Sequence, residues 1–195
     1  MLESPYSLGM APLSPTRPLT VEDLYSKPDD GFKYELEAGR LVREPLPGAR
    51  HGRVVARLTR LLDEFAERHR LGVVVAGDPG FILSRGPDTV RGPDVAFVSR
   101  VRFERVGDVA SAFPEAPDLA VEVLSPSNTP AAVHGKVADY LAAGTRLVWV
   151  VDPATRTVAA YRSLLAPRVF GEDEKLDAGD VLPGFGPRVG ELFEV

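Results

Sequence analysis

Two short apolar runs on either side of a helix-length segment constrain the fold most. PDLAVEVL at 117–124 and RLVWVVD at 146–152 are rich in branched residues, as are strands buried on both faces. The segment 130–143 between them has the spacing of a helix and is followed by Gly144, a common helix terminator. A strand, a helix and a strand in this order form a right-handed crossover between two parallel strands. The sequence therefore predicts an α/β protein.

The rest of the chain adds strands and further helices. Apolar residues recur at helical spacing between 50 and 70 and predict a long amphipathic helix. Before it, strands at 33–37 and 40–44 are expected to form a hairpin that turns through Ala38 and Gly39. The other expected elements are a helix over VEDLYS capped by Thr20, strands at 72–76, 80–84 and 94–99, a short helix within 100–116, and short strands after 152. We expect a mixed β-sheet with a helix on each side and an N-terminal hairpin.

Length and composition indicate one folded unit. The chain has 195 residues, of which 44% are hydrophobic, and this is enough for one domain with a sizeable core. Residues 1–18 are rich in Pro and Ser and are interpreted as a flexible tail, which leaves residues 19–195 as a single domain. The N-terminal segment lacks the features of a signal peptide, and the longest apolar run, LVWVV at 147–151, is too short to span a bilayer. We expect a soluble cytoplasmic protein.

Cysteine and charge content narrow the chemistry. The sequence has no cysteine, so disulfides and thiolate metal sites are excluded, and hard cations held by oxygen ligands become the leading candidates. The net charge of −5 argues against a protein that coats nucleic acid nonspecifically. It is compatible with a nuclease that gathers carboxylates around a metal ion.

An acid inside a buried strand marks the candidate site. Glu122 lies between Val121 and Val123, where an unpaired carboxylate would cost several kcal/mol or more, so the fold must supply a metal, a cation or a raised pKa. Asp94 begins the strand GPDVAFV, and Asp118 begins PDLAVEVL in the same manner. If these strands are neighbours, Asp94 and Glu122 can converge above one sheet edge, and a divalent cation between them would let both stay ionised.

The order of short motifs resembles a known family. These are YELEAGRLVREP, His51, GPD at 92–94, VEV around Glu122, EVLSPSNT, Lys136, DYLAAG and VWVVDP, which together cover roughly residues 20–195. In this order they resemble the Uma-type restriction endonuclease family, long carried as a domain of unknown function, within the PD-(D/E)XK nuclease superfamily. GPD alone would be a weak match, whereas the ordered set is far more specific.

The resemblance implies a restriction-endonuclease-like fold and a metal-dependent endonuclease that hydrolyses DNA phosphodiester bonds. Asp94, Glu122 and the main-chain carbonyl of Val123 would hold Mg²⁺ or Mn²⁺. The superfamily lysine two residues after the second acid is absent, because position 124 is leucine. The resemblance assigns its role to Lys136 on the following helix. By analogy with enzymes that cut two strands symmetrically, we expect a homodimer.

Two further residues are candidates by the same resemblance. Glu35 in the first hairpin strand is offered as an additional acid, to bind metal or position Lys136; it alternates in direction with Glu37, so only one of the two can face the site. His51 at the start of the long helix is offered as a phosphate contact or proton acceptor.

Less specific interpretations stay open for each feature. Glu122 could pair with an arginine in the core, Lys136 could be a solvated helix residue, and Asp118 is best explained by turn chemistry. For the whole chain, the alternative is a catalytically inactive nuclease-fold module that binds nucleic acid or a protein partner, since lysine is missing at 124 and the pI is acidic. A two-carboxylate glycosidase is disfavoured by an aromatic content of 8%.

Overall fold

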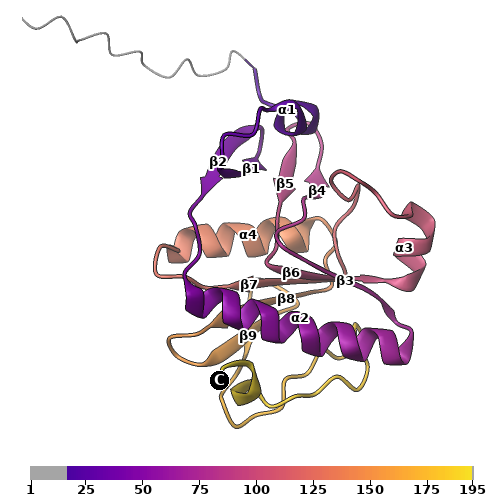
Figure 1. Cartoon of the computed structure of the whole chain (residues 1–195), viewed down its shortest axis with the longest axis vertical. Helices are drawn as coiled ribbons and strands as arrows, with labels where there is room; N and C mark the ends of the chain where they lie inside the picture. The colour runs from indigo at the N-terminus through magenta and orange to yellow at the C-terminus, as the bar shows by residue number, and fades with distance from the viewer. Residues whose placement is uncertain (1–16, 195) are drawn as a thin grey trace, which may run out of the picture.

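The structure, a computed structural model, describes residues 17–194, so the predicted tail over 1–18 falls almost entirely outside it. Figure 1 shows a small sheet above a larger one, with helices against both. The strands are β1 Lys33–Glu37, β2 Arg40–Glu44, β3 Gly72–Ala76, β4 Phe81–Ser84, β5 Thr89–Arg91, β6 Val95–Ser99, β7 Leu119–Val123, β8 Leu147–Asp152, β9 Thr157–Tyr161 and β10 Arg168–Phe170. The helices are α1 Val21–Ser26, α2 Ala49–His69, α3 Arg100–Val106, α4 Pro130–Ala142 and a 3₁₀ helix at Val189–Leu192. The predicted mixed α/β fold with an N-terminal hairpin is confirmed.

The hairpin belongs to a second sheet of four strands in the order β2-β1-β5-β4. Its turn places Ala38 and Gly39 at φ values of 49° and 76°, the left-handed region that two-residue hairpin turns require. Strand β5 was not expected from the sequence, because a three-residue strand between two turns carries almost no periodic signal. Through the pair Leu36 and Val90, β5 ties the hairpin to β4 and gives it a partner beyond its own turn.

The larger sheet has six strands in the order β10-β9-β8-β7-β6-β3. Strands β7 and β8 are parallel, with Leu119 beside Leu147 and Val121 beside Trp149, and α4 connects them. The other neighbouring strands are antiparallel. The predicted parallel pair joined by a helix is therefore present at the centre of the sheet.

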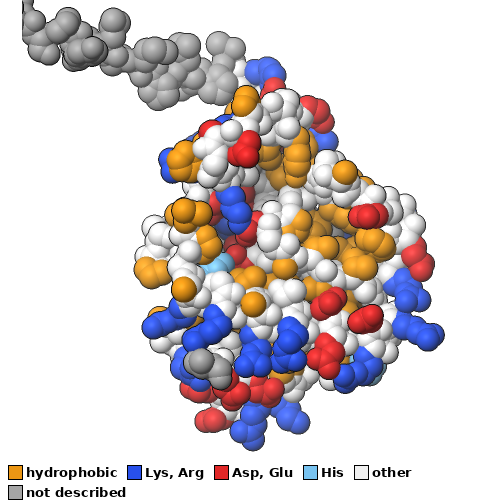
Figure 2. All heavy atoms as spheres, viewed as in Figure 1, with side chains coloured by type: hydrophobic (Ala, Val, Ile, Leu, Met, Phe, Trp, Pro, Cys, Tyr) orange, Lys and Arg blue, Asp and Glu red, His pale blue; other side chains and the backbone are white. Residues whose placement is uncertain are grey.

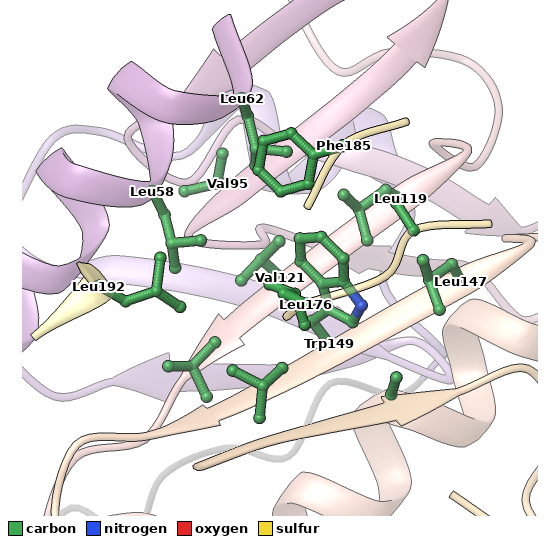
Figure 3. Close-up of a cluster of buried hydrophobic side chains, with 14 of the residues drawn as sticks. Leu58, Leu62, Val95, Leu119, Val121, Leu147, Trp149, Leu176, Phe185 and Leu192 are labelled. Carbon is green, nitrogen blue, oxygen red and sulfur yellow. The ribbon is translucent and has the colours of Figure 1, made fainter. Parts of the chain in front are cut away.

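Helices α2 and α4 cover opposite faces of this sheet, and alternate residues of β7 face each of them. Val121 packs with Leu58 and Leu62 of α2 and with Trp149, whereas Ala120 packs against α4. Figure 3 shows the first cluster, in which Phe185 of the C-terminal segment covers Trp149 with ring centroids 5.9 Å apart. Each large side chain buried here stabilises the fold by roughly 1.5–3 kcal/mol. Because alternate residues face opposite sides, Glu122 is directed toward α4.

The small and large sheets leave a hollow between them. Figure 2 shows acidic, basic and histidine side chains meeting in this hollow. Along residues 17–194, none of the helices combines the length and the apolar character needed to cross a bilayer.

Candidate active site

The hollow contains a cavity of about 320 Å³. Its inner end is lined by side chains that come from both sheets, α2 and α4: Glu35, Glu44, His51, Asp94, Glu122 and Lys136. The five residues proposed from the sequence as catalytic are all among them. Residues as far apart as β1 and α4 therefore meet at one point.

Asp94 lies where β6 begins, level with Glu122 on the neighbouring strand. Strands β6 and β7 are antiparallel with Val95 opposite Val121, so the next step of the register brings Asp94 beside Glu122. Asp94 Oδ2 accepts a hydrogen bond of 2.6 Å from the backbone N–H of Val123, and its Oδ1 is 3.1 Å from His51 Nε2. The strand register and the start of α2 thus orient this carboxylate.

Glu122 meets two side chains of α4. Tyr140 Oη donates to Glu122 Oε1 at 2.8 Å, and Lys136 Nζ lies 3.4 Å from Oε2. Lys136 and Tyr140 are four residues apart, so both point from the same helix face toward β7. The partners of the buried Glu122 are consequently a lysine and a tyrosine, and not the arginine that was considered from the sequence.

Lys136 is shared among three carboxylates. Its Nζ lies 3.1 Å from Glu35 Oε1 and 3.4 Å from Glu44 Oε1, in addition to Glu122. The lysine side chain is only 13% exposed, so it is not a solvated surface residue. From α4 it joins the hairpin to β7 of the large sheet.

Glu35 is held by an arginine of β5. Arg91 Nη1 donates to Glu35 Oε2 at 2.9 Å, and the backbone N–H of Gly92 donates to Oε1 at 2.8 Å. Arg91 is itself anchored by Asp139 of α4, at 2.6 Å from Nη2 to Oδ2. Glu37 is 51% exposed at its side chain, so Glu35 is the hairpin acid that faces the site.

The crowded charges alter proton affinities. Burial raises the pKa of Glu122 to about 7, with further contributions from the negative charges of Glu35 and Asp94, while Lys136 and Tyr140 oppose the shift. Burial alone would lower the pKa of Lys136, but its three carboxylate neighbours outweigh that effect and raise it. Burial also raises the pKa of Glu44. Lys136 is accordingly charged at neutral pH, whereas Glu122 is close to its midpoint.

The donor set suits a hard divalent cation. Seven acidic side chains and three lysines line the cavity. Burial, and after it the repulsion from Glu35 and Asp94, raises the pKa of Glu122, and a bound cation would offset both effects. Within residues 17–194, no group of three or more His, Asp or Glu side chains is arranged to hold a metal by itself. Mg²⁺ characteristically uses one or two carboxylates and completes its shell with water and phosphate oxygens, which fits a pair such as Asp94 and Glu122.

Asp118, the other acid at a strand start, lies elsewhere. It is 2% exposed and accepts a hydrogen bond of 2.8 Å from the Ser99 backbone N–H, with Arg102 Nε at 3.5 Å from its other oxygen. Its role in the structure is to fix the loop before β7, consistent with the turn interpretation.

Sequence reasoning missed four residues of this network: Glu44, Arg91, Tyr140 and Asp139. Tyr140 carried no separate signal, because a tyrosine at helical spacing is expected among the buried residues of a helix. A signal existed for Arg91, since it directly precedes the GPD motif, and for Asp139, which shares a helix face with Lys136. Nothing local distinguished Glu44 from other hairpin charges.

The layered α/β fold and the acidic cavity with its lysine define a restriction-endonuclease-like protein. A sequence model of the Uma2 family, described as "Putative restriction endonuclease", matches residues 21–190. The chain belongs to the Uma2 family.

A solved structure shows the same fold. It is described as a "putative nuclease belonging to DUF820" from Anabaena variabilis, and it superposes with a TM-score of 0.79 at 22% sequence identity, covering 90% of this chain and 98% of that one. No curated protein matches this chain. Family membership supports a nuclease function.

Proposed function

We propose that this protein is a metal-dependent endonuclease that hydrolyses phosphodiester bonds of DNA. The observation that carries the proposal is the convergence of Asp94, Glu122 and Lys136 at the inner end of one cavity. Two carboxylates beside a buried ammonium form the set of groups that phosphodiester hydrolysis requires, namely metal ligands and a cation for the phosphate.

Each residue has a role that its contacts support. Asp94 and Glu122, with the main-chain carbonyl of Val123, would hold Mg²⁺ or Mn²⁺. The cation supplies Lewis-acid chemistry at the phosphorus centre when bound. Lys136 donates to a non-bridging phosphate oxygen or orients the attacking water, because its ammonium stays charged among three carboxylates.

Glu35 and His51 complete the arrangement. Glu35 positions Lys136, since Arg91 and the Gly92 N–H fix both of its oxygens and leave one of them 3.1 Å from Nζ. His51 Nε2 contacts Asp94 at 3.1 Å and orients that carboxylate, while its Nδ1 is buried without a hydrogen-bond partner among residues 17–194.

A homodimer is part of the proposal. Strand β3 lies at one edge of the large sheet, and its segment GVVVA carries no charged residue. Uncharged edge strands favour pairing with another strand, and a two-fold copy of this one would continue the sheet. Light scattering on the wild-type protein and on Ala76→Lys, at the exposed residue of β3, tests this: a dimer that becomes monomeric in the variant supports it, and a monomeric wild type overturns it.

The nuclease proposal is tested by calorimetric titration of Mn²⁺ together with nicking of supercoiled plasmid on the same samples. Asp94→Asn and Glu122→Gln preserve shape and remove one negative charge each. Asp118→Asn is the matched control for Asp94, because it follows a proline at a strand start outside the cavity. Glu37→Gln is the control for Glu122.

The expected result is loss of Mn²⁺ binding and of nicking in the two site variants, with both retained in the two controls. Binding without nicking in the wild type would favour an inactive member of the fold or a substrate other than plasmid DNA. Absence of binding in the wild type would overturn metal dependence and leave Glu122 as a structural partner of Lys136.

A further inference from the structure

The outer part of the cavity has an aromatic wall. Tyr25, Phe32 and Tyr34 come from α1, the segment after it and β1, and all three line the same cavity as the acids. We call these three side chains the aromatic lip. Tyr25 and Phe32 are 47% and 46% exposed, and no other aromatic side chain in residues 17–194 is as exposed. Exposed rings gathered at a cavity mouth indicate a ligand with flat apolar surfaces.

Cations lie against the rings of the aromatic lip. The guanidinium of Arg43 is 3.2 Å from the ring centroid of Phe32, and Lys27 Nζ is 4.2 Å from that of Tyr34. These contacts hold the rings and place positive charge beside them. The wall is thus suited to a ligand that combines flat rings with negative charge.

The three acids of this outer part are matched in number by three cations beside them. Asp30 pairs with Lys27 and Asp78 with Lys33. Asp29 accepts a hydrogen bond from the Gly31 backbone N–H, and Arg43 beside Phe32 supplies the third positive charge. The unbalanced negative charge therefore lies at the inner end, where Glu35, Glu44 and Glu122 all contact the same lysine, Lys136. An anionic ligand that meets bound cations at the inner end encounters no net repulsion at the lip.

The cavity's size excludes a paired duplex from its interior. About 320 Å³ accommodates one group of small-molecule size, and the side chain of Glu122 at the inner end is 12% exposed. Bases in a duplex are stacked on one another and present only their edges in the grooves. A base that stacks on a protein ring must be unpaired or turned out of its helix.

We propose that the aromatic lip stacks unpaired nucleobases, so that the substrate of this site is a single-stranded or locally unpaired nucleic acid rather than an intact duplex. The inference deepens the proposed nuclease function and rests on it for the identity of the phosphodiester that enters the inner end. Tyr25 and Phe32 act in binding, next to the residues that act on the phosphate.

The test measures binding without cleavage. Fluorescence anisotropy in Ca²⁺ compares the binding of three labelled probes: a single strand, its duplex, and the same strand carrying abasic sites. The single strand has about 12 nucleotides, a length within the range of site sizes of proteins that bind single strands. DNA and RNA versions of each probe show which sugar the site accepts. The proteins are wild type, Tyr25→Leu, Phe32→Leu, the conservative Phe32→Tyr, and Leu165→Ala as an exposed apolar control far along the chain.

The expected result is that wild type binds the single strand about tenfold more tightly than the duplex or the abasic strand, since each stacked base contributes about 1–3 kcal/mol. Tyr25→Leu and Phe32→Leu should each lose about tenfold in affinity for the single strand, while Phe32→Tyr and Leu165→Ala keep wild-type affinity. Equal binding of the intact and abasic strands, no effect of the two leucine variants, or no binding of any probe would overturn the inference.

Parallel nicking assays in Mn²⁺ separate this inference from the nuclease proposal. Stacking-dependent binding without cleavage of any probe would support the aromatic lip as a nucleobase site while the nuclease proposal fails. If intact duplex is cleaved and the cleavage is unaffected by Tyr25→Leu and Phe32→Leu, the nuclease proposal is supported and the proposal of an unpaired substrate is overturned.

Discussion

Lys136 Nζ on helix α4 lies 3.4 Å from Glu122 Oε2 on the buried strand β7. This contact gives the buried acid a cationic partner, and it places Lys136 where the proposed site needs the lysine that position 124 lacks. The same ammonium also reaches Glu35 and Glu44, so that one lysine links the two sheets.

Replacing Lys136 separates catalysis from metal binding. Lys136→Met keeps the aliphatic stem and removes the charge, and we expect cleavage to fall about 10²–10³-fold, the usual effect of losing one group that stabilises transition-state charge. Mn²⁺ affinity should not decrease, because the variant removes a cation that competes for the same carboxylates. Calorimetry and single-turnover cleavage measure the two effects, with exposed Lys175→Met as control. A wild-type cleavage rate in Lys136→Met would contradict the assigned role.

Tyr140 is predicted to orient Glu122 through its hydroxyl group. The side chain is fully buried, and Tyr140→Phe removes the donor to Glu122 Oε1 without changing the packing. We expect a loss of about 1–3 kcal/mol in Mn²⁺ binding free energy if the bound carboxylate must stay in its present rotamer. Calorimetric titration measures this, and the half-buried Tyr161→Phe on β9 is the control. Equal affinity in wild type and Tyr140→Phe would show that Lys136 and the strand suffice to orient Glu122.

We predict that Arg91 contributes to the stability of the fold as well as to the geometry of the site. The residue is 3% exposed and bonds to Glu35 and Asp139, so Arg91→Met leaves the buried carboxylate of Glu35 and the half-buried one of Asp139 without this partner. Breaking a buried pair in this way costs about 3–5 kcal/mol. Urea denaturation measures the loss, and Arg60→Met on the exposed face of α2 should change stability by about 0.5 kcal/mol or less. A loss in Arg91→Met as small as that of the control would contradict the prediction.

The raised pKa of Glu122 predicts that its contribution to stability depends on pH. A carboxyl group with a pKa of about 7 in the folded protein and an ordinary value near 4.5 when unfolded binds its proton more tightly in the folded state. Its stabilising contribution is full below the unfolded pKa and is lost as the pH rises through about 7. Glu122→Gln removes this dependence.

Urea denaturation of metal-free wild type and Glu122→Gln between pH 5.5 and 8.5 measures the effect. Relative to wild type, the variant should gain about 2 kcal/mol of unfolding free energy across this interval, because the wild type alone loses a bound proton in its folded state. Glu37→Gln, on the exposed side of the hairpin, should show no such trend. A difference between wild type and Glu122→Gln that does not change with pH would contradict the raised pKa.

Local patterns in the sequence were sufficient for most elements. Alternating branched residues predicted β7 and β8, helical spacing predicted α2 and α4, and Thr20 predicted the capped start of α1. The structure has each of them, and Asp23 completes the cap with a reciprocal hydrogen bond. These signals are readable because each element must bury one face, which imposes a period on its own residues. The position of Glu122 inside such a strand was enough to indicate a candidate site.

The sequence by itself determined which residues are candidates for the chemistry, and the tertiary structure decided which of them meet. Lys136 contacts Glu35 over a separation of 101 residues, and Arg91 contacts Asp139 over 48. No local period encodes such contacts, since they arise only when strand register and helix packing bring distant segments together. The same packing turned Glu35 inward and Glu37 outward, paired Glu122 with lysine and tyrosine, and gathered Tyr25 and Phe32 at the mouth of the cavity.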